Sequence, residues 1–133
     1  MSKIYGVVTG EVDDLDDPEG EGRIRVRFGW LPGNNQSYWA PVATLMAGDR
    51  RGSWFMPEVG DEVLVAFDHG DVNHPYVIGF LWNGQDLPPV DDGASSEVRR
   101  LRTVSGAVTL SSDEALTLAC MQLIVSMPVG AEI

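Results

Sequence analysis

The residues best suited to bind a metal are two histidines that flank a glycine turn. His69 and His74 lie five residues apart, with Asp68 and Asp71 beside them. Imidazole and carboxylate groups together suit several divalent ions. Two histidines in a loop more often form hydrogen bonds with the backbone, however. We therefore favour a turn that holds no metal ion.

Two carboxylates, Glu58 and Glu62, could form an acid–base pair. A glycosidase needs one carboxylic acid and one carboxylate across a cleft. These glutamates flank Gly60, so a solvated turn is the simpler interpretation. The sequence also lacks a phosphate loop, a nucleophile elbow and a dinucleotide-binding glycine fingerprint. It thus predicts a protein that is not an enzyme and needs no cofactor.

Four aspartates gather in the loop of residues 13–22, and hard cations prefer such clustered oxygen ligands. The spacing lacks the ligand pattern and the final glutamate of a calcium-binding EF-hand loop, so a solvated turn is favoured. Cys120 is the single cysteine, which excludes an intrachain disulfide and a cysteine-based zinc site. We expect it to be a small buried hydrophobic residue.

Acidic residues outnumber basic ones by 20 to 9, which gives a net charge of -11. This charge repels nucleic-acid phosphates and anionic membranes. The local basic cluster of Arg99, Arg100 and Arg102 is too small for a polybasic anchor. The first residues lack the apolar run of a signal peptide, and no stretch of about 20 apolar residues could span a bilayer. We therefore expect cytoplasmic synthesis and no nucleic-acid partner.

Short alternating segments, broken by Gly, Pro and Asp, predict an all-β protein. The strand-like runs are residues 4–12, 23–28, 38–47, 63–67 and 75–82. Residues 23–28 alternate arginines with apolar residues, so one face points to the core, and the arginines are expected to pair with acidic groups on neighbouring strands or chains. Five short strands with glycine-rich turns suit a small closed barrel such as the OB-fold.

The composition changes to Pro, Asp, Gly, Ala and Ser after Leu87, which indicates a linker. The predicted division is a barrel over residues 1–89, a linker over 90–99 and a tail over 100–133. The tail contains short apolar triplets that so short a segment cannot bury alone. It therefore requires packing against the barrel or against other copies of the chain.

A chain of motifs over about residues 4–89 closely resembles the OB-fold domain of the VgrG and phage baseplate assembly protein V family. The upstream matches are residues 22–28, 39–43 and 52–55. The downstream motif consists of Pro57, Gly60, Asp61, Glu62, Val63, Phe67, Gly70, Asp71, Pro75, Gly79, Pro88 and Pro89. Gly60 and Gly70 suit turns that need positive φ, and Pro57 and Pro75 are expected at the starts of strands.

The resemblance implies that the barrel is followed by an intertwined trimeric β-helix. Residues 100–106 look like the start of that needle. The residues expected to support trimerisation are Arg100, Arg102, Ser105, Gly106, Leu116, Leu118, Leu123 and Val125. The tail departs from the family in being short, in having Ala107 after Gly106, and in lacking a His-x-His pair. A separate PAAR-like tip protein is therefore expected, and residues 89–100 leave no room for a lysozyme domain.

The implied function is structural: a homotrimeric central spike of a contractile injection system, such as a phage tail, a tailocin or a type VI-like machine. It would link the baseplate hub and tail tube to a tip that pierces the target cell envelope. It would assemble in the cytoplasm and become part of a virion or injection particle. The alternative is an OB-fold module that binds single-stranded nucleic acid by stacking its bases on aromatic residues, namely Trp30, Tyr38, Trp39 or Trp54. We expect instead that these aromatic residues pack in the core.

Overall fold

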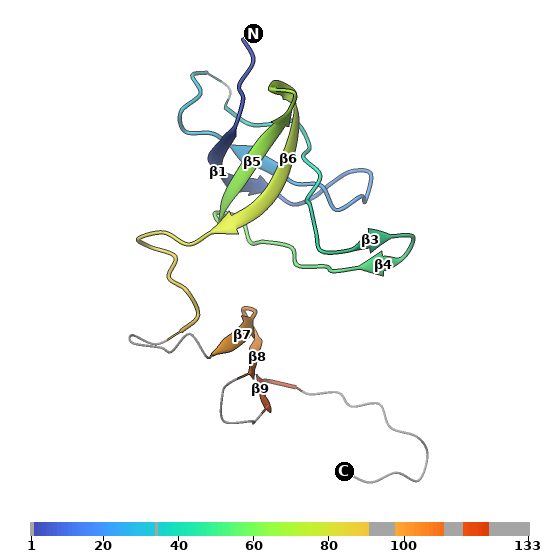
Figure 1. Cartoon of the computed structure of the whole chain (residues 1–133), viewed down its shortest axis with the longest axis vertical. Helices are drawn as coiled ribbons and strands as arrows, with labels where there is room; N and C mark the ends of the chain where they lie inside the picture. Colours follow the sequence, from blue (N-terminus) through green and yellow to red (C-terminus); the bar gives the residue numbers. More distant parts are fainter. Residues whose placement is uncertain (1, 34, 91–97, 111–115, 123–133) are drawn as a thin grey trace. The chain divides into compact units, whose positions relative to one another are not determined.

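The computed structural model describes residues 2–33, 35–90, 98–110 and 116–122, and in these ranges the protein is all-β (Figure 1). The chain divides into two compact units, Met1–Leu87 and Pro88–Ile133. The strands of the first unit are β1 (Val7–Asp14), β2 (Arg25–Arg27), β3 (Ala47–Gly48), β4 (Arg51–Gly52), β5 (Glu62–Asp68) and β6 (Asp71–Leu81). The predicted domain boundaries stay a prediction.

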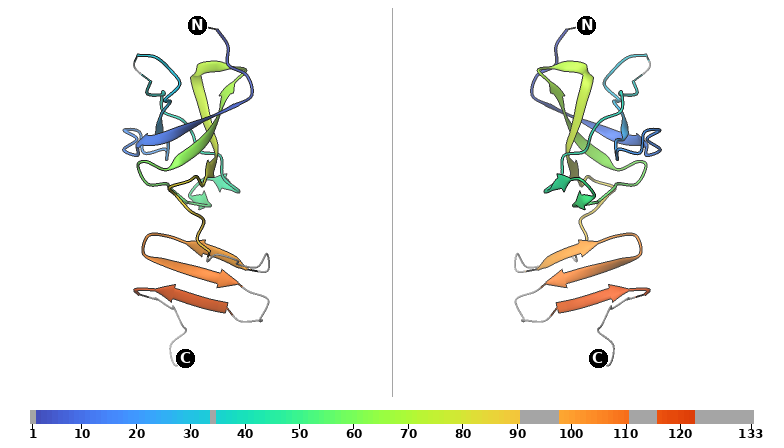
Figure 2. Two further views of the ribbon diagram at one scale, coloured as in Figure 1. Left: turned by 90° about the vertical axis from the view of Figure 1, so that its left-hand side faces the viewer. Right: turned by 90° about the vertical axis from the view of Figure 1, so that its right-hand side faces the viewer.

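A four-stranded antiparallel sheet forms the body of the first unit. Its strand order is β2-β1-β5-β6, so β1 lies between β2 and β5. The strands twist and curl around one another, as the two side views show (Figure 2). Register shifts between Val12 and Asp14 in β1, and opposite Leu64 and Val65 of β5, mark bulges that increase this bending.

Residues 36–43, the closing segment, join the two edges of this sheet. On one side, Ile24 and Ala40 exchange backbone hydrogen bonds of 3.0 and 2.8 Å. On the other side, the Val77 N–H donates to Pro41 O at 2.9 Å, beside a parallel bridge to β6. The sheet therefore curls into a small barrel, consistent with the predicted OB-fold. The strand-like run expected over residues 38–47 is split, because pairing with β6 ends at residue 43 and β3 begins at Ala47.

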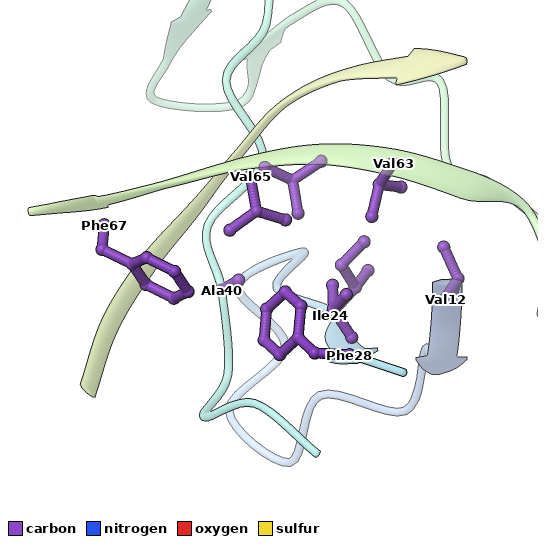
Figure 3. Close-up of a cluster of buried hydrophobic side chains, with 9 residues drawn as sticks. Val12, Ile24, Phe28, Ala40, Val63, Val65 and Phe67 are labelled. Carbon is purple, nitrogen blue, oxygen red and sulfur yellow. The ribbon is translucent and has the colours of Figure 1, made fainter. Parts of the chain in front are cut away.

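The core lies inside the curled sheet, because alternate residues of each strand point inward. The predicted alternation over residues 23–28 is confirmed, since Ile24, Val26 and Phe28 are buried. The buried side chains point toward one another in Figure 3, and the full set is Val12, Ile24, Val26, Phe28, Ala40, Val63, Val65, Phe67 and Val77.

A tight turn joins β5 to β6. His69 and Gly70 have φ values of 49° and 78°. Two successive positive φ values are typical of a type I′ hairpin turn, whose twist matches that of the strands. The expectation of positive φ at Gly60 and Gly70 is confirmed, since Gly60 has φ 98°.

The expected place of the two prolines is wrong. Pro75 lies inside β6, opposite Phe67, and Pro57 lies before β5 rather than at its first residue. Pro75 is tolerated because the N–H of Val77, two residues later, points away from β5 toward Pro41. The nitrogen of Pro75 faces the same way, so the missing N–H removes no bond to β5.

Strands β3 and β4 form a two-stranded ribbon, and Figure 1 shows it projecting sideways from the barrel. Residues 44–55, which contain the ribbon, are called the arm. Gly52 has φ 146°, and a Cβ there would lie 2.3 Å from the Met46 carbonyl oxygen. Only glycine therefore fits this close approach within the arm.

The second unit contains β7 (Arg99–Arg102), β8 (Gly106–Leu110) and β9 (Leu116–Cys120), paired antiparallel in that order. The Thr103 N–H donates to Gly106 O at 2.7 Å in the turn between β7 and β8. Arg100 Nη1 donates to Pro89 O at 2.7 Å. These strands agree with a β-rich tail, and their winding with other chains into a β-helix stays a prediction.

Candidate functional site: an apolar sheet face and a projecting arm

Each of the two histidines lies near an aspartate. His74 Nδ1 lies 3.0 Å from Asp71 Oδ2, and His69 Nε2 lies 3.9 Å from Asp68 Oδ1. The Asn73 N–H and His74 lower the pKa of Asp71. Among the residues that the structure describes, no group of three His, Cys, Asp or Glu side chains could hold a metal ion.

The carboxylates near Gly60 belong to a turn. The Asp61 side chain accepts a hydrogen bond of 2.9 Å from the Glu58 N–H, and the Asp61 N–H donates to Glu58 O at 3.1 Å. Glu62 instead begins β5, directly opposite Glu11 of β1. The exposed Glu58 is thus part of the turn that leads into the sheet.

The acidic loop is organised around Asp17. The carboxylate of Asp17 accepts two hydrogen bonds from the Arg23 guanidinium, at 2.8 and 3.0 Å, and others from the N–H groups of Glu19, Glu21 and Arg23. The Asp17 side chain is only 3% exposed. Arg23 and these N–H groups hold the pKa of Asp17 well below its ordinary value. The carboxylate of Asp17 therefore holds the loop in one conformation, and the residues around it, such as Asp16 and Glu19, are exposed.

The three arginines at positions 23, 25 and 27 each contact another group of the first unit. Arg27 Nη2 lies 2.7 Å from Asp13 Oδ1 of the neighbouring strand, and Arg23 pairs with Asp17. The expected pairing with a neighbouring strand is confirmed for Arg27, whereas the partner of Arg23 lies in the loop between β1 and β2. Arg25 instead lies over the Trp39 ring, 5.3 Å from its centroid, which is a cation–π geometry.

The expectation that the core accounts for the aromatic residues is wrong for three of four. Trp54 is 70% exposed, Tyr38 60% and Trp30 44%. Trp39 is half-buried beneath Arg25. Core positions are filled by smaller aliphatic residues and two phenylalanines, so these larger rings remain on the surface.

The outer face of the sheet is also apolar. Cross-strand register places Val7, Ala66 and Tyr76 in one row across β1, β5 and β6. Leu64 lies in the next row, opposite the bulge that contains Ile78. Val7 is 55% and Ile78 43% exposed. We call these five residues the outer face.

An acidic border adjoins the outer face. Glu11 and Glu62 lie directly opposite each other, and no basic side chain in the described part of the chain lies within ion-pair distance of either. Like charges in this arrangement are destabilising. A hollow of about 230 Å³ begins beside Glu62, and its lining is Asp61, Glu62, Phe80, Leu81, Trp82 and Asp86.

The arm combines exposed apolar side chains with two basic residues. Leu45 is 95% exposed, and Met46, Trp54 and Phe55 are also exposed. A groove of about 470 Å³ lies at its base, lined by apolar side chains that include Trp54 and Met46. Its two arginines are Arg50 and Arg51, and they form no ion pair with any carboxylate that the structure describes.

The predicted family-motif residues mostly lie along the hairpin of β5 and β6. Val63 and Phe67 belong to the core, and Pro57 and Pro75 are buried. Gly60 and Asp61 form the turn before β5, and Glu62 begins that strand. The remaining ones lie in the β5–β6 turn, at the start of β6, beside the β6 bulge or in the second unit: Gly70, Asp71, Gly79, Pro88 and Pro89.

The residues predicted to trimerise are only partly described. Arg100 and Arg102 lie in β7, Ser105 in the following turn, and Gly106 begins β8. Leu116, Leu118 and Cys120 lie in β9. The structure does not describe the side chain of Cys120, so its burial stays a prediction. Leu123 and Val125 lie outside the described residues. Their role in trimerisation stays a prediction.

Sequence reasoning missed the outer face and the arm. The signal for the outer face was the run 63–67, which is apolar on both sides of the strand, so that Leu64 and Ala66 require cover as well as Val63 and Val65. The arm gave a weaker signal, because exposed Leu45 and Trp54 resemble core residues in sequence.

Comparison with known proteins decides the family. Residues 8–82, more than half of the chain, match the family model described as the type VI secretion system/phage-baseplate injector OB domain. The chain belongs to this family. The match begins in β1 and ends just beyond β6, so the injector OB domain is the barrel itself.

Several type VI secretion system spike proteins are similar to this injector OB domain. VgrG5 of Pseudomonas aeruginosa is 36% identical over 89 residues, which cover 64% of this chain and 11% of the relative. VgrG1c of the same organism is 33% identical, with shares of 68% and 12%. VgrG3 of Vibrio cholerae is 32% identical, with shares of 67% and 10%. The chain spans about a tenth of the length of these relatives.

Proposed function

We propose that the protein is a homotrimeric structural spike component of a contractile injection system. The observation that carries this proposal is the match of the whole barrel to the injector OB domain. The relatives are named as spike proteins, which supports the same role here. The barrel would join the baseplate hub and tail tube to the β-rich tail, which would wind with two other tails into a short needle.

The proposed work is mechanical. A separate PAAR-like tip protein would complete the needle, and contraction of the sheath would drive it through the target envelope. Asp17, Asp61 and Asp71 bind neighbouring groups within loops and turns, which supports a structural use of these carboxylates. The protein would assemble in the cytoplasm and then form part of the particle.

Two measurements test the proposal. Light scattering of the full chain is expected to give the mass of a trimer, and a monomer at all concentrations would contradict the proposal. Electron microscopy of the particle that co-purifies with the tagged protein is expected to show a contractile sheath and baseplate. Particles without either feature would also count against it.

Exposed Tyr38 and Trp54 favour testing the alternative of nucleic-acid binding. The net charge of -11 opposes it, because a polyanion is repelled by the barrel surface. A labelled single-stranded oligonucleotide at low salt is therefore expected to show no binding in titration. Submicromolar affinity that weakens steeply with added salt would favour the alternative.

A further inference from the structure

The outer face has the composition of a surface that is covered in the assembled protein. Antiparallel sheets commonly have one side that faces water, and that side carries polar residues. Here Val7, Ala66, Tyr76, Leu64 and Ile78 are five apolar residues of one sheet face, which they share with Thr9 opposite Leu64, on a protein of net charge -11. Contiguous exposed apolar patches mark interaction sites.

The border of this face indicates the charge of its partner. The opposed Glu11 and Glu62 repel each other, and Asp61 and Asp86 stand beside Glu62 around the hollow. Trp82 lines the same hollow. Carboxylates relieve their repulsion by pairing with a cation, and an aromatic ring favours a guanidinium above it. The partner should therefore bring apolar side chains and an arginine together.

The arm offers this combination. It presents exposed Leu45, Met46, Trp54 and Phe55, and between them lie Arg50 and Arg51. The guanidinium of Arg51 lies against the backbone of Gly48, on the ribbon itself. The arm projects sideways from its own barrel (Figure 1), so it is placed to meet a neighbouring molecule.

We propose that the arm of one copy covers the outer face of a second copy, with Arg51 of the arm against Glu62 at the acidic border. This inference rests on the proposed trimer. The two surfaces of the contact differ, so each copy gives its arm to one neighbour and receives an arm from the other. A head-to-tail contact of this kind closes into a ring when its rotation is threefold.

A charge-swap experiment on the full chain tests the contact. The variants are Arg51→Glu, Glu62→Arg and the double variant that carries both changes. Mass photometry across a dilution series measures the protein concentration at which the trimer dissociates. Each single variant is expected to raise this concentration by at least about tenfold, because a close ion pair becomes a repulsion. The double variant is expected to return it close to the wild-type value.

Asp16→Arg provides the matched control, since Asp16 is an exposed carboxylate on the loop between β1 and β2. It reverses one charge away from the proposed contact and is expected to leave dissociation unchanged. Circular dichroism melts verify that every variant keeps its β-structure. Any variant that fails to fold is replaced by its neutral counterpart, Arg51→Gln or Glu62→Gln. The neutral variant is also expected to raise the concentration at which the trimer dissociates.

The possible failures are distinguishable. A wild-type trimer whose dissociation is unaffected by either single variant overturns this contact and leaves the proposed spike function intact. A double variant that dissociates as readily as the weaker single variant also overturns it. A wild-type protein that is monomeric throughout the dilution series overturns the proposed trimer, and the contact with it.

Discussion

The hydroxyl group of Ser37 completes the hydrogen bonding of the closing segment. Ser37 is buried, and its Oγ accepts a hydrogen bond of 2.8 Å from the Val26 N–H while donating to Tyr38 O at 2.7 Å. The Ser37 hydroxyl thus takes the place of a backbone carbonyl as acceptor for the Val26 N–H, where β2 and the closing segment pair irregularly. Among the described residues, no buried side-chain nitrogen or oxygen lacks a partner.

Replacing Ser37 with alanine should destabilise the barrel. The buried Val26 N–H would lose its acceptor, which costs about 1–3 kcal/mol of unfolding free energy. Urea denaturation followed by tryptophan fluorescence measures the change. Ser53→Ala is the control, because no hydrogen bond of the Ser53 side chain is found in the described structure, and it should be nearly neutral. Equal stability of the two variants would contradict the role of Ser37.

Asp17 should make the stability of the barrel sensitive to acid. Its pKa is lowered in the folded protein by Arg23, so the stabilisation is present above the unfolded pKa of about 3.9 and is lost as pH falls below it. Asp17→Asn removes this contribution at neutral pH. The melting temperature of the variant should start lower and fall less between about pH 5 and pH 2.

Asp16→Asn is the control for this experiment. Its carboxylate is exposed and makes no hydrogen bond in the described structure, so the acid dependence should match that of the wild type. Parallel acid profiles for Asp17→Asn and the wild type would show that the Asp17–Arg23 pair contributes nothing to stability.

The β5–β6 hairpin is the element on which the barrel depends most. Its turn requires two positive φ values, and the Gly70 carbonyl accepts a hydrogen bond of 2.8 Å from the Ile4 N–H. The turn therefore also holds the segment that leads into β1.

Gly70→Ala should weaken this element. The left-handed conformation costs an L-residue about 1–2 kcal/mol. In addition, the new Cβ would lie 3.0 Å from Lys3 Cβ. Gly84→Ala is the matched control, because open space surrounds Gly84. Thermal melts should show a clear loss for Gly70→Ala and little change for Gly84→Ala, and equal effects would contradict this account of the turn.

Strands with a clear period were predictable from the sequence, and irregular ones were not. Residues 23–28 and 63–67 alternate or cluster apolar residues, and both lie in the barrel wall. The first strand was expected within residues 4–12, and β1 begins inside that range at Val7 but continues two residues beyond it, to Asp14. The place of Pro75 depends on which way its nitrogen faces in a formed sheet, which local sequence does not specify.

The candidate site was less predictable because its residues meet only after folding. Glu11 and Glu62 are far apart in sequence and become opposite through the register of β1 and β5. The arm is built from two strands of two residues each, too short to show a period. The family motif nevertheless located the barrel, because turn glycines and core residues have fixed spacing.

On the scale of the whole molecule, the tail after residue 89 should control assembly. The barrel has its own core, whereas the described part of the second unit is a single three-stranded sheet. A single sheet buries an apolar side only by packing against a second layer of structure. A truncation that ends at Pro89 should be mostly monomeric in light scattering, while the full chain is trimeric. A trimeric truncation would place the main trimer contacts in the barrels alone.

The closing segment is the most weakly paired part of the barrel, which affects how fast its amides exchange with solvent. Isolated bridges hold residues 36–43, whereas β5 and β6 share a nearly continuous ladder. Local opening of this segment therefore costs less free energy than opening of the hairpin. In native-state hydrogen exchange, amides of residues 36–43 should exchange well before those of β5. Residues 36–43 would then detach from β2 and β6 while the β5–β6 hairpin stays folded. Equal protection of both regions would exclude this local opening.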